Sequence, residues 1–508
     1  MQLQLLHHEI EYAAQAYGEK IALTGGGDSL SFEQLSERSG YLAAALPVLG
    51  VNRGDRLAIL AHNCVDYIVW HYAAARAGVI FHVLNTRLVQ AELSWMLKNA
   101  GSVVLIADAD FSALARDLQS ECEAIHSLIG IGQTDLDHPT DDLAGRCLGG
   151  ASSPAEPDDA ALLIYTSGTT GCPKGALQTH GGSLHTDQLS RNAMNIDTDD
   201  VHLALMPFFH QAGLIRTRAT ILAGGLSVIP GKLPAQDTAE AIARSGATFT
   251  MLASPAQHQS LLNMLKTDGS GPFSRLRMLL GGGGLGARTM ATLRILCESL
   301  DCVYFGVYGQ TETTGPATYI TGEDAFLHPD SCGQPFPGLD ITIWDSNCEP
   351  MPVGATGEIA IRGAVTARYW ANNEANTSLY EGEWIHTGDL GYLDEDGFLY
   401  IVGRLKELIK TGAENVYPRE VEAVLEAHPQ IADVAVFGIP DSTWGELVCA
   451  GVVTQNADPL DTDLLRDFCR GKIAGYKIPK KVVIVESIPR NHTGKVIRWK
   501  LAASAGRD

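Results

Sequence analysis

The segment Tyr165–Ala176 (YTSGTTGCPKGA) concentrates the kinds of group that bind phosphate. It combines hydroxyl side chains, glycines and one cation: Thr166, Ser167, Gly168, Thr169, Thr170 and Lys174. A loop of this composition after an apolar strand offers backbone N–H groups, hydroxyl donors and a positive charge to a polyphosphate. The spacing differs from the P-loop, which places four residues between a glycine and Gly-Lys-Ser/Thr. We therefore predict a phosphate-binding loop of another kind, with a flexible surface turn as the alternative.

A second glycine-rich segment, Leu280–Ala287 (LGGGGLGA), lies between an expected strand and an expected helix. Its glycines at Gly281, Gly283 and Gly286 satisfy GxGxxG, which by itself indicates dinucleotide binding. That interpretation also requires an acidic residue after the next strand, and none follows Cys302–Tyr308. We favour close approach of this backbone to a nucleotide base, and a closely packed turn without a ligand is the alternative.

The segment Tyr308–Thr313 (YGQTET) follows an apolar run and contains an aromatic ring, hydroxyls and a carboxylate. Tyr308 can stack on a purine. Thr311 can donate to a phosphate, and Glu312 can bind Mg²⁺ through oxygen. An exposed glutamate in a surface loop is the alternative for Glu312.

Charged residues of the last quarter of the chain are candidates for nucleotide contacts. Asp389, in HTGDL, is expected between two strands, where it can accept hydrogen bonds from both ribose hydroxyls, and Arg404 can contact ribose or phosphate. Lys406 and Lys410 are four residues apart, as on one face of a helix. Lys495, after a Thr-Gly pair in PRNHTGKVIRWKL, can reach into a site formed elsewhere. Each of these, taken alone, is also typical of a solvated turn or basic tail.

The elements that must position these residues follow an α/β pattern. Short apolar runs alternate with helix-like stretches, at Arg56–Leu60, Cys64–Ala77, Val103–Ile106, Ala161–Tyr165, Thr248–Leu252, Leu276–Leu280 and Val303–Val307. This alternation predicts parallel α/β layers. From about Gly333 closely spaced strands predict a β-rich subdomain, at Gly338–Trp344, Gly357–Arg362, Trp384–Thr387 and Gly397–Val402. After Arg404 the α/β pattern returns, and Leu405–Glu407 is too short to be a flexible tether, so we expect a hinge there.

Length and charge restrict the class of protein. A chain of 508 residues exceeds the size of a single core, so we expect at least two domains. A net charge of -22 argues against nucleic acid and anionic membranes as partners. We expect no membrane span, because no apolar run reaches about 18 residues, and no secretory leader in MQLQLLHHEIEYAAQ. The ten cysteines contain no CxxC pair, which predicts reduced thiols, a cytoplasmic protein and no zinc site.

Five segments, taken in order, resemble the adenylate-forming superfamily of acyl-CoA synthetases, non-ribosomal adenylation domains and luciferases. They are YTSGTTGCPKGA, GGGGLGA, YGQTET, the stretch from HTGDLGYL to NVYPREVE, and PRNHTGKVIRWKL. The resemblance extends from about residue 10 to residue 501. It implies a large N-terminal ATP- and acyl-binding region at 1–405, whose β-rich subdomain covers about 333–405. It also implies a small mobile α+β C-terminal domain at 406–508 that carries the catalytic lysine.

The resemblance also implies roles for individual residues. Lys495, Thr311 and Glu312 would serve adenylation, with Mg²⁺ on Glu312. ATP and AMP would be bound by Thr166, Ser167, Gly168, Thr169, Thr170, Lys174, Gly282, Gly283, Tyr308, Asp389 and Arg404. Lys406 matches the hinge, and Lys410, Gly412 and Ala413 match the segment that approaches the pantetheine arm. Ala413 replaces a glycine of many relatives, which narrows that channel by a methyl group.

The acyl pocket is expected near Met206–Gly213 (MPFFHQAG). Amino-acid-activating relatives carry an aspartate there, and this chain has none, so an amino acid substrate is disfavoured. The expected lining is His210, Gln211, Gly213, Gly281 and Gly306. A histidine satisfied in the core is the alternative for His210. Arg216 and Arg218 are candidates to recognise a second carboxylate, although helical spacing more often directs such arginines to solvent.

These observations predict an AMP-forming acid–thiol ligase that adenylates a fatty or aromatic acid with ATP and transfers the acyl group to coenzyme A. One alternative is an acyl-AMP ligase that loads an acyl carrier protein, although no inserted segment of the usual kind is visible before the small domain. Another is a dinucleotide-dependent oxidoreductase or an adenylate-binding sensor. A monomer or a homodimer is expected.

Overall fold

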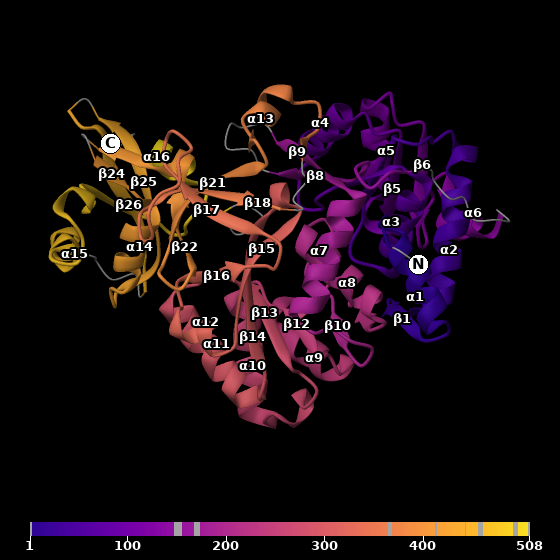
Figure 1. Ribbon diagram of the computed structural model, residues 1–508, viewed down its shortest axis with the longest axis horizontal. Helices are drawn as coiled ribbons and strands as arrows, with labels where there is room; N and C mark the ends of the chain where they lie inside the picture. Colours follow the sequence, from indigo (N-terminus) through magenta and orange to yellow (C-terminus); the bar gives the residue numbers. More distant parts are fainter. Residues whose placement is uncertain are drawn as a thin grey trace. The chain divides into compact units, whose positions relative to one another are not determined.

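The computed structural model describes residues 3–146, 155–166, 173–363, 368–411, 414–441, 443–455, 461–490 and 496–505. The chain forms two compact units (Figure 1). The first contains Met1–Ile341 and Ile361–His386, and the second contains Thr342–Ala360 and Thr387–Asp508. The predicted domains at 1–405 and 406–508 stay a prediction.

Two sheets organise the first unit. One follows the order β19-β9-β8-β4-β3-β5-β6-β7. Its strands are β3 Arg56–Leu60, β4 Ile80–Val83, β5 Val104–Asp108, β6 Ser127–Ile131, β7 His138–Pro139, β8 Ala160–Thr166, β9 Lys174–Thr179 and β19 Arg368–Tyr369. β3 to β8 pair in parallel, whereas β9 is antiparallel to both of its neighbours.

The other sheet of this unit contains the order β16-β15-β14-β13-β12-β10-β11-β1-β2. Its strands are β1 Ile21–Gly25, β2 Asp28–Ser31, β10 Val201–Leu203, β11 Leu226–Val228, β12 Phe249–Met251, β13 Met278–Gly282, β14 Val303–Gln310, β15 Gly315–Thr321 and β16 Ser331–Pro335. β1 and β10 to β14 run parallel, and β2, β15 and β16 add antiparallel pairs. The predicted parallel α/β layers are therefore confirmed.

Helices cover these sheets (Figure 1). They are α1 His8–Tyr17, α2 Phe32–Ala45, α3 Val65–Ala77, α4 Gln90–Ala100, α5 Ser112–Glu121, α6 Thr140–Arg146, α7 His180–Ala193, α8 Gln211–Ala223, α9 Thr238–Ser245, α10 Pro255–Asp268, α11 Ala287–Leu300, α12 Glu323–Leu327 and α13 Asn373–Thr377. Nearly all residues of α3 are buried, in a core with Phe81 and Phe208. The helix can be buried on nearly all sides because it is apolar on nearly all sides. It ends at Gly78, which adopts φ +64° and donates its N–H to carbonyls of the last turn. Among the described residues, no helix is both long and apolar enough to cross a membrane.

A cluster of buried charges joins four helices of the first unit. Arg218 on α8 donates from Nε and Nη2 to the two carboxylate oxygens of Asp187 on α7, at 2.6 and 3.1 Å, and both side chains are fully buried. Tyr72 on α3 donates to Glu9 on α1 at 3.1 Å. Burial and the nearby Asp187 charge raise the pKa of Glu9 well above its usual range. The expectation that Arg218 and Arg216 more often face solvent is therefore wrong, because α8 is buried and its arginines find partners on α7.

The β-rich segment orders its strands as β17-β18-β21-β22. These are β17 Asp340–Trp344, β18 Gly357–Arg362, β21 Trp384–Leu393 and β22 Leu399–Arg404, and the short β20 Tyr380–Glu381 pairs with β21. Predicted strands at all four places are confirmed.

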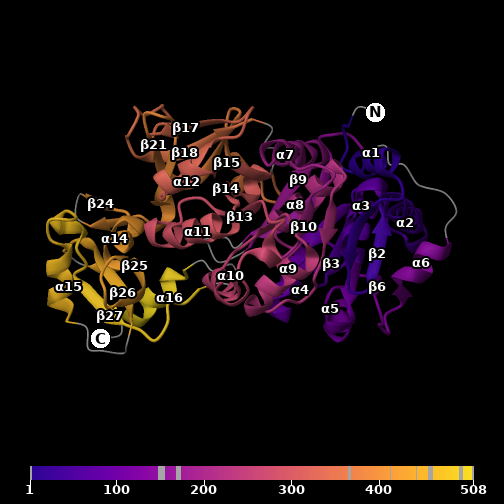
Figure 2. The ribbon, with the colours of Figure 1, turned by 90° about the horizontal axis from the view of Figure 1, so that it is seen from below.

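The last hundred residues build a sheet with helices on both faces (Figure 2). The strands are β23 Ile409–Thr411, β24 Glu414–Val416, β25 Ile431–Asp441, β26 Gly445–Thr454 and β27 Lys481–Ile484, and the helices are α14 Pro418–Glu426, α15 Thr462–Cys469 and α16 Arg498–Ala505. Alternate residues of β25 explain the two layers. Val434 and Val436 pack with α14 and α15, whereas Ala435 and Phe437 pack with α16.

Arg218→Met is expected to lower the free energy of unfolding by about 3–5 kcal/mol, because it leaves the buried Asp187 without its cation. Urea unfolding followed by tryptophan fluorescence measures the change. The matched control is Arg244→Met, whose partner Glu240 and whose own side chain are both more than two thirds exposed, so its loss should stay within about 0.5 kcal/mol. Equal losses for the two variants would contradict the argument.

Candidate active site

The end of β8 meets the loop that follows β14. Thr166 is the last residue of β8 and pairs in the ladder with Lys174, the first residue of β9. Glu312 lies in a 3₁₀ turn, Thr311–Thr313, directly after β14. The Thr166 hydroxyl donates to Glu312 Oε1 at 3.3 Å. The structure thus brings together three residues that the sequence placed in two separate motifs.

Tyr369 completes this cluster and was missed by the sequence analysis. Its hydroxyl donates to Glu312 Oε1 at 2.9 Å, and Lys174 Nζ lies 4.8 Å from the centroid of its ring. Tyr369 reaches this place because β19 pairs with β9, opposite Ala176. No local signal in the sequence marks it, since the contact depends on pairing between strands far apart in the chain.

Gln178 was missed as well. It lies on β9, fully buried, and its Nε2 donates to the Thr311 carbonyl at 3.3 Å. This hydrogen bond joins the phosphate-segment strand to the turn that carries Glu312. A signal did exist here, because a glutamine in an apolar strand is a polar group that needs a partner once buried.

The Glu312 carboxylate suits a magnesium ion. Mg²⁺ binds oxygen and is usually held by one or two carboxylates together with substrate phosphates and water. The described contacts of Glu312 engage Oε1 only, through Thr166 and Tyr369. Two hydroxyl donors therefore orient the group while Oε2 points elsewhere, which fits a carboxylate that offers its second oxygen to a cation.

The glycines at the end of β13 and directly after it differ in how much space surrounds them. A Cβ at Gly281 would lie 2.3 Å from the Tyr304 hydroxyl oxygen, and one at Gly283 would lie 2.7 Å from Cys332 Cα. At these positions glycine is required by packing within the protein. At Gly282 a Cβ would meet only Leu285, at 3.5 Å, so this position has room toward a ligand.

Gly306 and Tyr308 lie on β14 beside these glycines. Gly306 pairs in register with Gly281, and Tyr308 pairs across with Thr318. A Cβ on Gly306 would come within 3.0 Å of Ile320. The predicted acyl and adenine residues of this region therefore occupy adjacent strand ends.

The predicted acyl segment forms the start of α8. His210 is the residue before the helix, with its ring centroid 4.7 Å from that of Phe209. Gln211 follows, and its Nε2 is buried without a hydrogen-bond partner among the described residues. A Cβ on Gly213 would lie 2.6 Å from the Pro207 carbonyl oxygen, so glycine lets the segment fold back on the helix. An unpaired buried amide donor beside a histidine is suited to a carboxylate or carbonyl oxygen.

Asp389 and Arg404 form an ion pair in the second unit, with Arg404 Nε 2.7 Å from Asp389 Oδ1. They are register partners on β21 and β22. The expectation that HTGDL lies between two strands is wrong, because the segment is inside β21. The strand continues through it because Gly388 adopts φ +67° and Thr387 donates its hydroxyl to the Ile359 carbonyl of β18 at 2.7 Å.

Lys406 and Lys410 lie on different elements. Lys406 is exposed in the 3₁₀ turn Leu405–Glu407, and Lys410 is exposed on β23, where its backbone N–H donates to Glu446 at 2.7 Å. The expected shared helical face is therefore wrong, since the chain straightens into a strand after the turn. Several predicted site residues lie outside the described residues: Ser167, Gly168, Thr169, Thr170, Gly412, Ala413 and Lys495.

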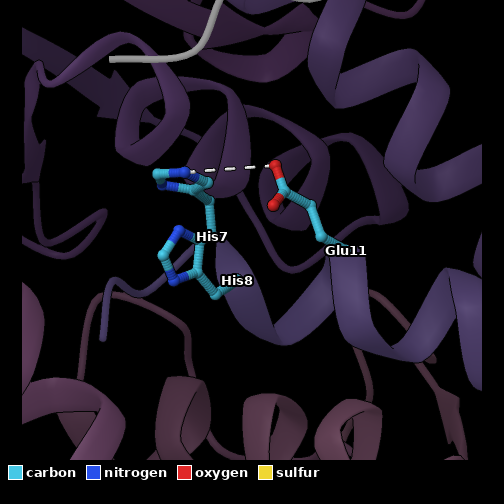
Figure 3. Close-up of side chains that lie close together, drawn as sticks. All are labelled: His7, His8 and Glu11. Carbon is cyan, nitrogen blue, oxygen red and sulfur yellow. Dashed lines mark ion pairs between the residues drawn. The ribbon is translucent and has the colours of Figure 1, made fainter. Parts of the chain in front are cut away.

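Three side chains at the start of α1 come close enough to share a metal ion (Figure 3). Ligand atoms of His7, His8 and Glu11 all lie within 4.8 Å of one another. Nδ1 of His8, however, accepts backbone N–H groups of residues 4 and 5, and Arg76 donates to Glu11 at 2.8 Å. Burial lowers the pKa of His7 to about 3. Internal donors already engage the lone pairs of His8 and Glu11, so we interpret the group as a polar cluster that anchors α1.

Comparison with known proteins matches this architecture over nearly the whole chain. The AMP-binding enzyme family matches residues 10–370, and the AMP-binding enzyme C-terminal domain family matches residues 420–495. The 2-succinylbenzoate–CoA ligase of Bacillus cereus (strain AH820) is 32% identical over 485 residues, 95% of each chain.

Solved structures agree with this family assignment. The o-succinylbenzoate CoA synthetase of Bacillus subtilis, in complex with its acyl-adenylate intermediate, superposes with a TM-score of 0.84 at 30% identity, over 99% of this chain and 98% of that one. A fatty acyl CoA synthetase of Mycobacterium tuberculosis gives a TM-score of 0.80 at 28% identity, over 99% of both chains.

The chain therefore belongs to the AMP-binding enzymes. It is an AMP-forming acyl-CoA synthetase, with ATP, a carboxylic acid and coenzyme A as its substrates. The dinucleotide-dependent oxidoreductase suggested by GxGxxG is thereby set aside, and close packing accounts for two of the glycines of that motif.

Tyr369→Phe is expected to lower kcat/KM for ATP about tenfold, because the variant loses a hydrogen bond to the Glu312 carboxylate. The Mg²⁺ concentration for half-maximal rate should rise as well. Steady-state kinetics at varied Mg²⁺ measure both. Tyr476→Phe is the matched control, because its exposed ring contacts Lys477 in the second unit. An unchanged Mg²⁺ dependence in Tyr369→Phe would contradict the argument.

Proposed function

We propose that this ligase activates an aromatic carboxylic acid that carries a second carboxylate, by way of an acyl-adenylate, and transfers the acyl group to coenzyme A. The structural observation that supports a ligase site here is a cluster of side chains. In this cluster Thr166 and Tyr369 donate hydrogen bonds to the Glu312 carboxylate, and Lys174 lies over the Tyr369 ring. The aromatic acid is supported by the similarity to the 2-succinylbenzoate–CoA ligase of Bacillus cereus and to the Bacillus subtilis synthetase with its acyl-adenylate.

In the first half-reaction a carboxylate oxygen of the acid attacks the α-phosphorus of ATP, and the bond to pyrophosphate breaks. The phosphate segment from Thr166 to Lys174, with Ser167, Gly168, Thr169 and Thr170, binds the leaving pyrophosphate. Thr311 contacts the α-phosphate, and Lys495 neutralises the charge that develops on its oxygens. Glu312 would hold Mg²⁺, which would supply positive charge to neutralise part of the phosphate charge.

Candidate nucleoside contacts come from an aromatic ring, an open backbone and a carboxylate. Tyr308 stacks on the adenine, whose edge meets the backbone at the open Gly282 and at its closely packed neighbour Gly283. Asp389 accepts hydrogen bonds from the ribose hydroxyls. Its ion pair with Arg404 orients the carboxylate for that task.

In the second half-reaction the small domain rotates about Lys406, which withdraws Lys495 and brings Lys410, Gly412 and Ala413 to the thiol. The thiol sulfur loses its proton and attacks the acyl carbon. A carbon–sulfur bond forms, the bond to AMP breaks, and AMP leaves. An acyl carrier protein offers the same thiol chemistry and is the alternative acceptor.

The acyl pocket is formed by His210, Gln211, Gly213, Gly281 and Gly306, and the unpaired Gln211 amide supplies a donor to the acid. Arg216 follows Gly213 by one turn on the same face of α8 and is buried. Its Nη1 donates to the Ser190 hydroxyl at 2.9 Å, its Nε has no partner among the described residues, and burial lowers its pKa to about 10. A desolvated cation of this kind gains most from an anion, which favours Arg216 as the group that recognises the second carboxylate.

Purified protein should release pyrophosphate from ATP and Mg²⁺ only when supplied with its acid, and should make a thioester when CoA is added. The panel is 2-succinylbenzoate, benzoate, anthranilate and a medium-chain fatty acid, with a carrier protein as a second acceptor. Lys495→Ala is expected to lower pyrophosphate release about a hundredfold or more. Release without any acid preference, or full release by Lys495→Ala, would overturn the assignment.

Arg216→Met should raise KM for 2-succinylbenzoate about tenfold or more, and leave KM for benzoate within about threefold, because only the first acid has a second carboxylate. Pyrophosphate release at varied acid concentration gives both values. Arg191→Met, on the neighbouring helix α7, is the matched control. Equal effects on the two acids would show that Arg216 serves the fold and not recognition.

We also place the protein in the cytoplasm. The cysteines among the described residues are free thiols, in keeping with a reducing compartment.

A further inference from the structure

Asn63 connects two segments of the first unit that lie 141 to 145 residues apart in the chain. Its Nδ2 donates to the Met206 carbonyl at 2.8 Å and to the Ala204 carbonyl at 3.3 Å. Its Oδ1 accepts the Phe208 backbone N–H at 2.8 Å. One side-chain amide therefore makes three hydrogen bonds to the backbone that leads into the predicted acyl region.

This backbone has left the sheet and needs partners from elsewhere. The pairing of β10 with β11 ends at Leu203, and the Ala204 N–H donates once more to the Val228 carbonyl at 2.9 Å. Residues 204–210 then form neither helix nor strand, although Phe208 is fully buried. A buried backbone N–H without a partner is costly. The amide of Asn63 offers both donors and an acceptor, as a neighbouring strand would, and so takes the place of that strand.

Asn63 is itself held on a fixed backbone. It lies in the short connection between β3 and α3. The preceding residue, His62, donates its backbone N–H to Asp108 Oδ2 at 2.8 Å, and its Nδ1 lies 2.9 Å from the same oxygen. The His62 ring stacks on that of Phe111, with centroids 4.9 Å apart. Because Asp108 is the last residue of β5, which pairs with β3, the connection is tied to the neighbouring strand.

The segment that Asn63 holds is packed against the start of α8. The His210 N–H donates to the Pro207 carbonyl, and the Gly213 N–H donates to the His210 carbonyl, both at 3.0 Å. A Cβ at Gly213 would lie 2.7 Å from the Met206 carbonyl oxygen. The carbonyl that accepts the amide therefore lies directly against the first turn of the helix. A shift of this carbonyl would be passed on to His210 and to Gln211.

We propose that Asn63 is a positioning residue for the acid: its amide fixes the Met206–Phe208 backbone, and through it the places of His210 and Gln211 in the acyl pocket. This inference rests on the proposed acyl pocket. The pocket residues follow the held backbone within a few positions, so they have little freedom to correct a displacement of it. A misplacement of about 1 Å is enough to weaken a well-oriented contact severely.

The groups proposed to bind ATP lie on other elements. Thr166 ends β8, and Glu312 lies in the turn after β14. Among the described residues, none of the hydrogen bonds of Asn63 reaches either of them. Loosening the segment at residues 204–210 should therefore weaken binding of the acid and leave binding of ATP unchanged.

The test measures pyrophosphate release by the full-length enzyme, with ATP and the acid that supports turnover varied separately. Asn63→Asp keeps the acceptor for Phe208 but places an oxygen opposite the Met206 carbonyl, where a donor is needed. It should raise KM for the acid about tenfold or more and leave KM for ATP within about threefold. Asn63→Leu has a similar volume, removes all three hydrogen bonds and should raise KM for the acid at least as much.

Asn52→Asp is the matched control. The Asn52 amide lies in an exposed turn, where it donates to the Gly50 carbonyl at 3.3 Å, so both KM values should stay within about twofold of the wild type. Thermal unfolding is recorded for every variant. A merely structural role for Asn63 would reduce the amount of folded enzyme, which lowers kcat and leaves KM for the acid unchanged. That result would overturn the inference.

Combination with Gln211→Leu shows whether Asn63 acts through the pocket. In the Gln211→Leu background, Asn63→Asp should raise KM for the acid by less than it does in the wild type. An equal increase in both backgrounds would contradict this route. If Gln211→Leu alone leaves KM for the acid unchanged, the proposed acyl pocket fails. If Gln211→Leu raises it and Asn63→Asp does not, only this inference fails.

Discussion

The buried pair between Arg218 and Asp187 is the interaction on which the arrangement of the first unit depends. Both side chains are fully buried, so each requires the other, and neither helix can shift without exposing an unpaired charge to an apolar core. α7 continues from β9, the strand that begins at Lys174, and α8 begins at Gln211. The pair therefore fixes β9 and the start of α8 relative to each other, through the two helices α7 and α8.

Two carboxylates with a proposed role in the site are held by partners of their own unit. Glu312 accepts hydrogen bonds from Thr166 and Tyr369 on one oxygen. In the second unit Asp389 is oriented by Arg404 across a strand pair. Such orientation lowers the cost of assembling the transition state, because the groups do not have to find their positions during the reaction.

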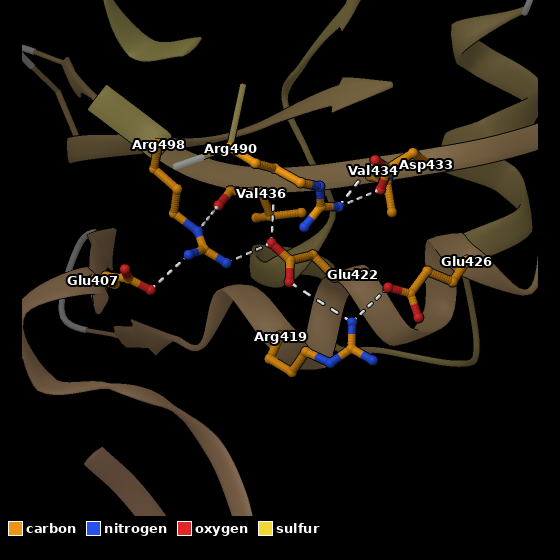
Figure 4. A network of polar contacts seen from close by, with 9 residues as sticks. All are labelled: Glu407, Arg419, Glu422, Glu426, Asp433, Val434, Val436, Arg490 and Arg498. Carbon is orange, nitrogen blue, oxygen red and sulfur yellow. Dashed lines mark hydrogen bonds and ion pairs between the residues drawn. The ribbon is translucent and has the colours of Figure 1, made fainter. Parts of the chain in front are cut away.

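In the second unit one guanidinium links several elements. Arg498 bonds to Glu407, Glu422 and the Val436 carbonyl, and it therefore joins the turn Leu405–Glu407, helix α14 and strand β25 (Figure 4). A guanidinium suits the task because its donors are fixed in a plane, whereas a lysine offers one mobile charge.

The sequence by itself determined the α/β layers, the order of the motifs and the family, because apolar periodicity and dense Gly/Ser/Thr segments are local properties. It placed β3 and α3 almost to the residue, and it named Thr166 with Glu312 and Asp389 with Arg404, two pairs whose members contact each other in the structure. Only the tertiary structure decided that Tyr369 bonds to Glu312, that Gln178 bonds to Thr311, and that HTGDL runs inside a strand. Those outcomes depend on which strands pair and on which charged residues are buried together. Strand pairing and shared burial depend on residues that are far apart in the chain, and a local sequence pattern does not encode them.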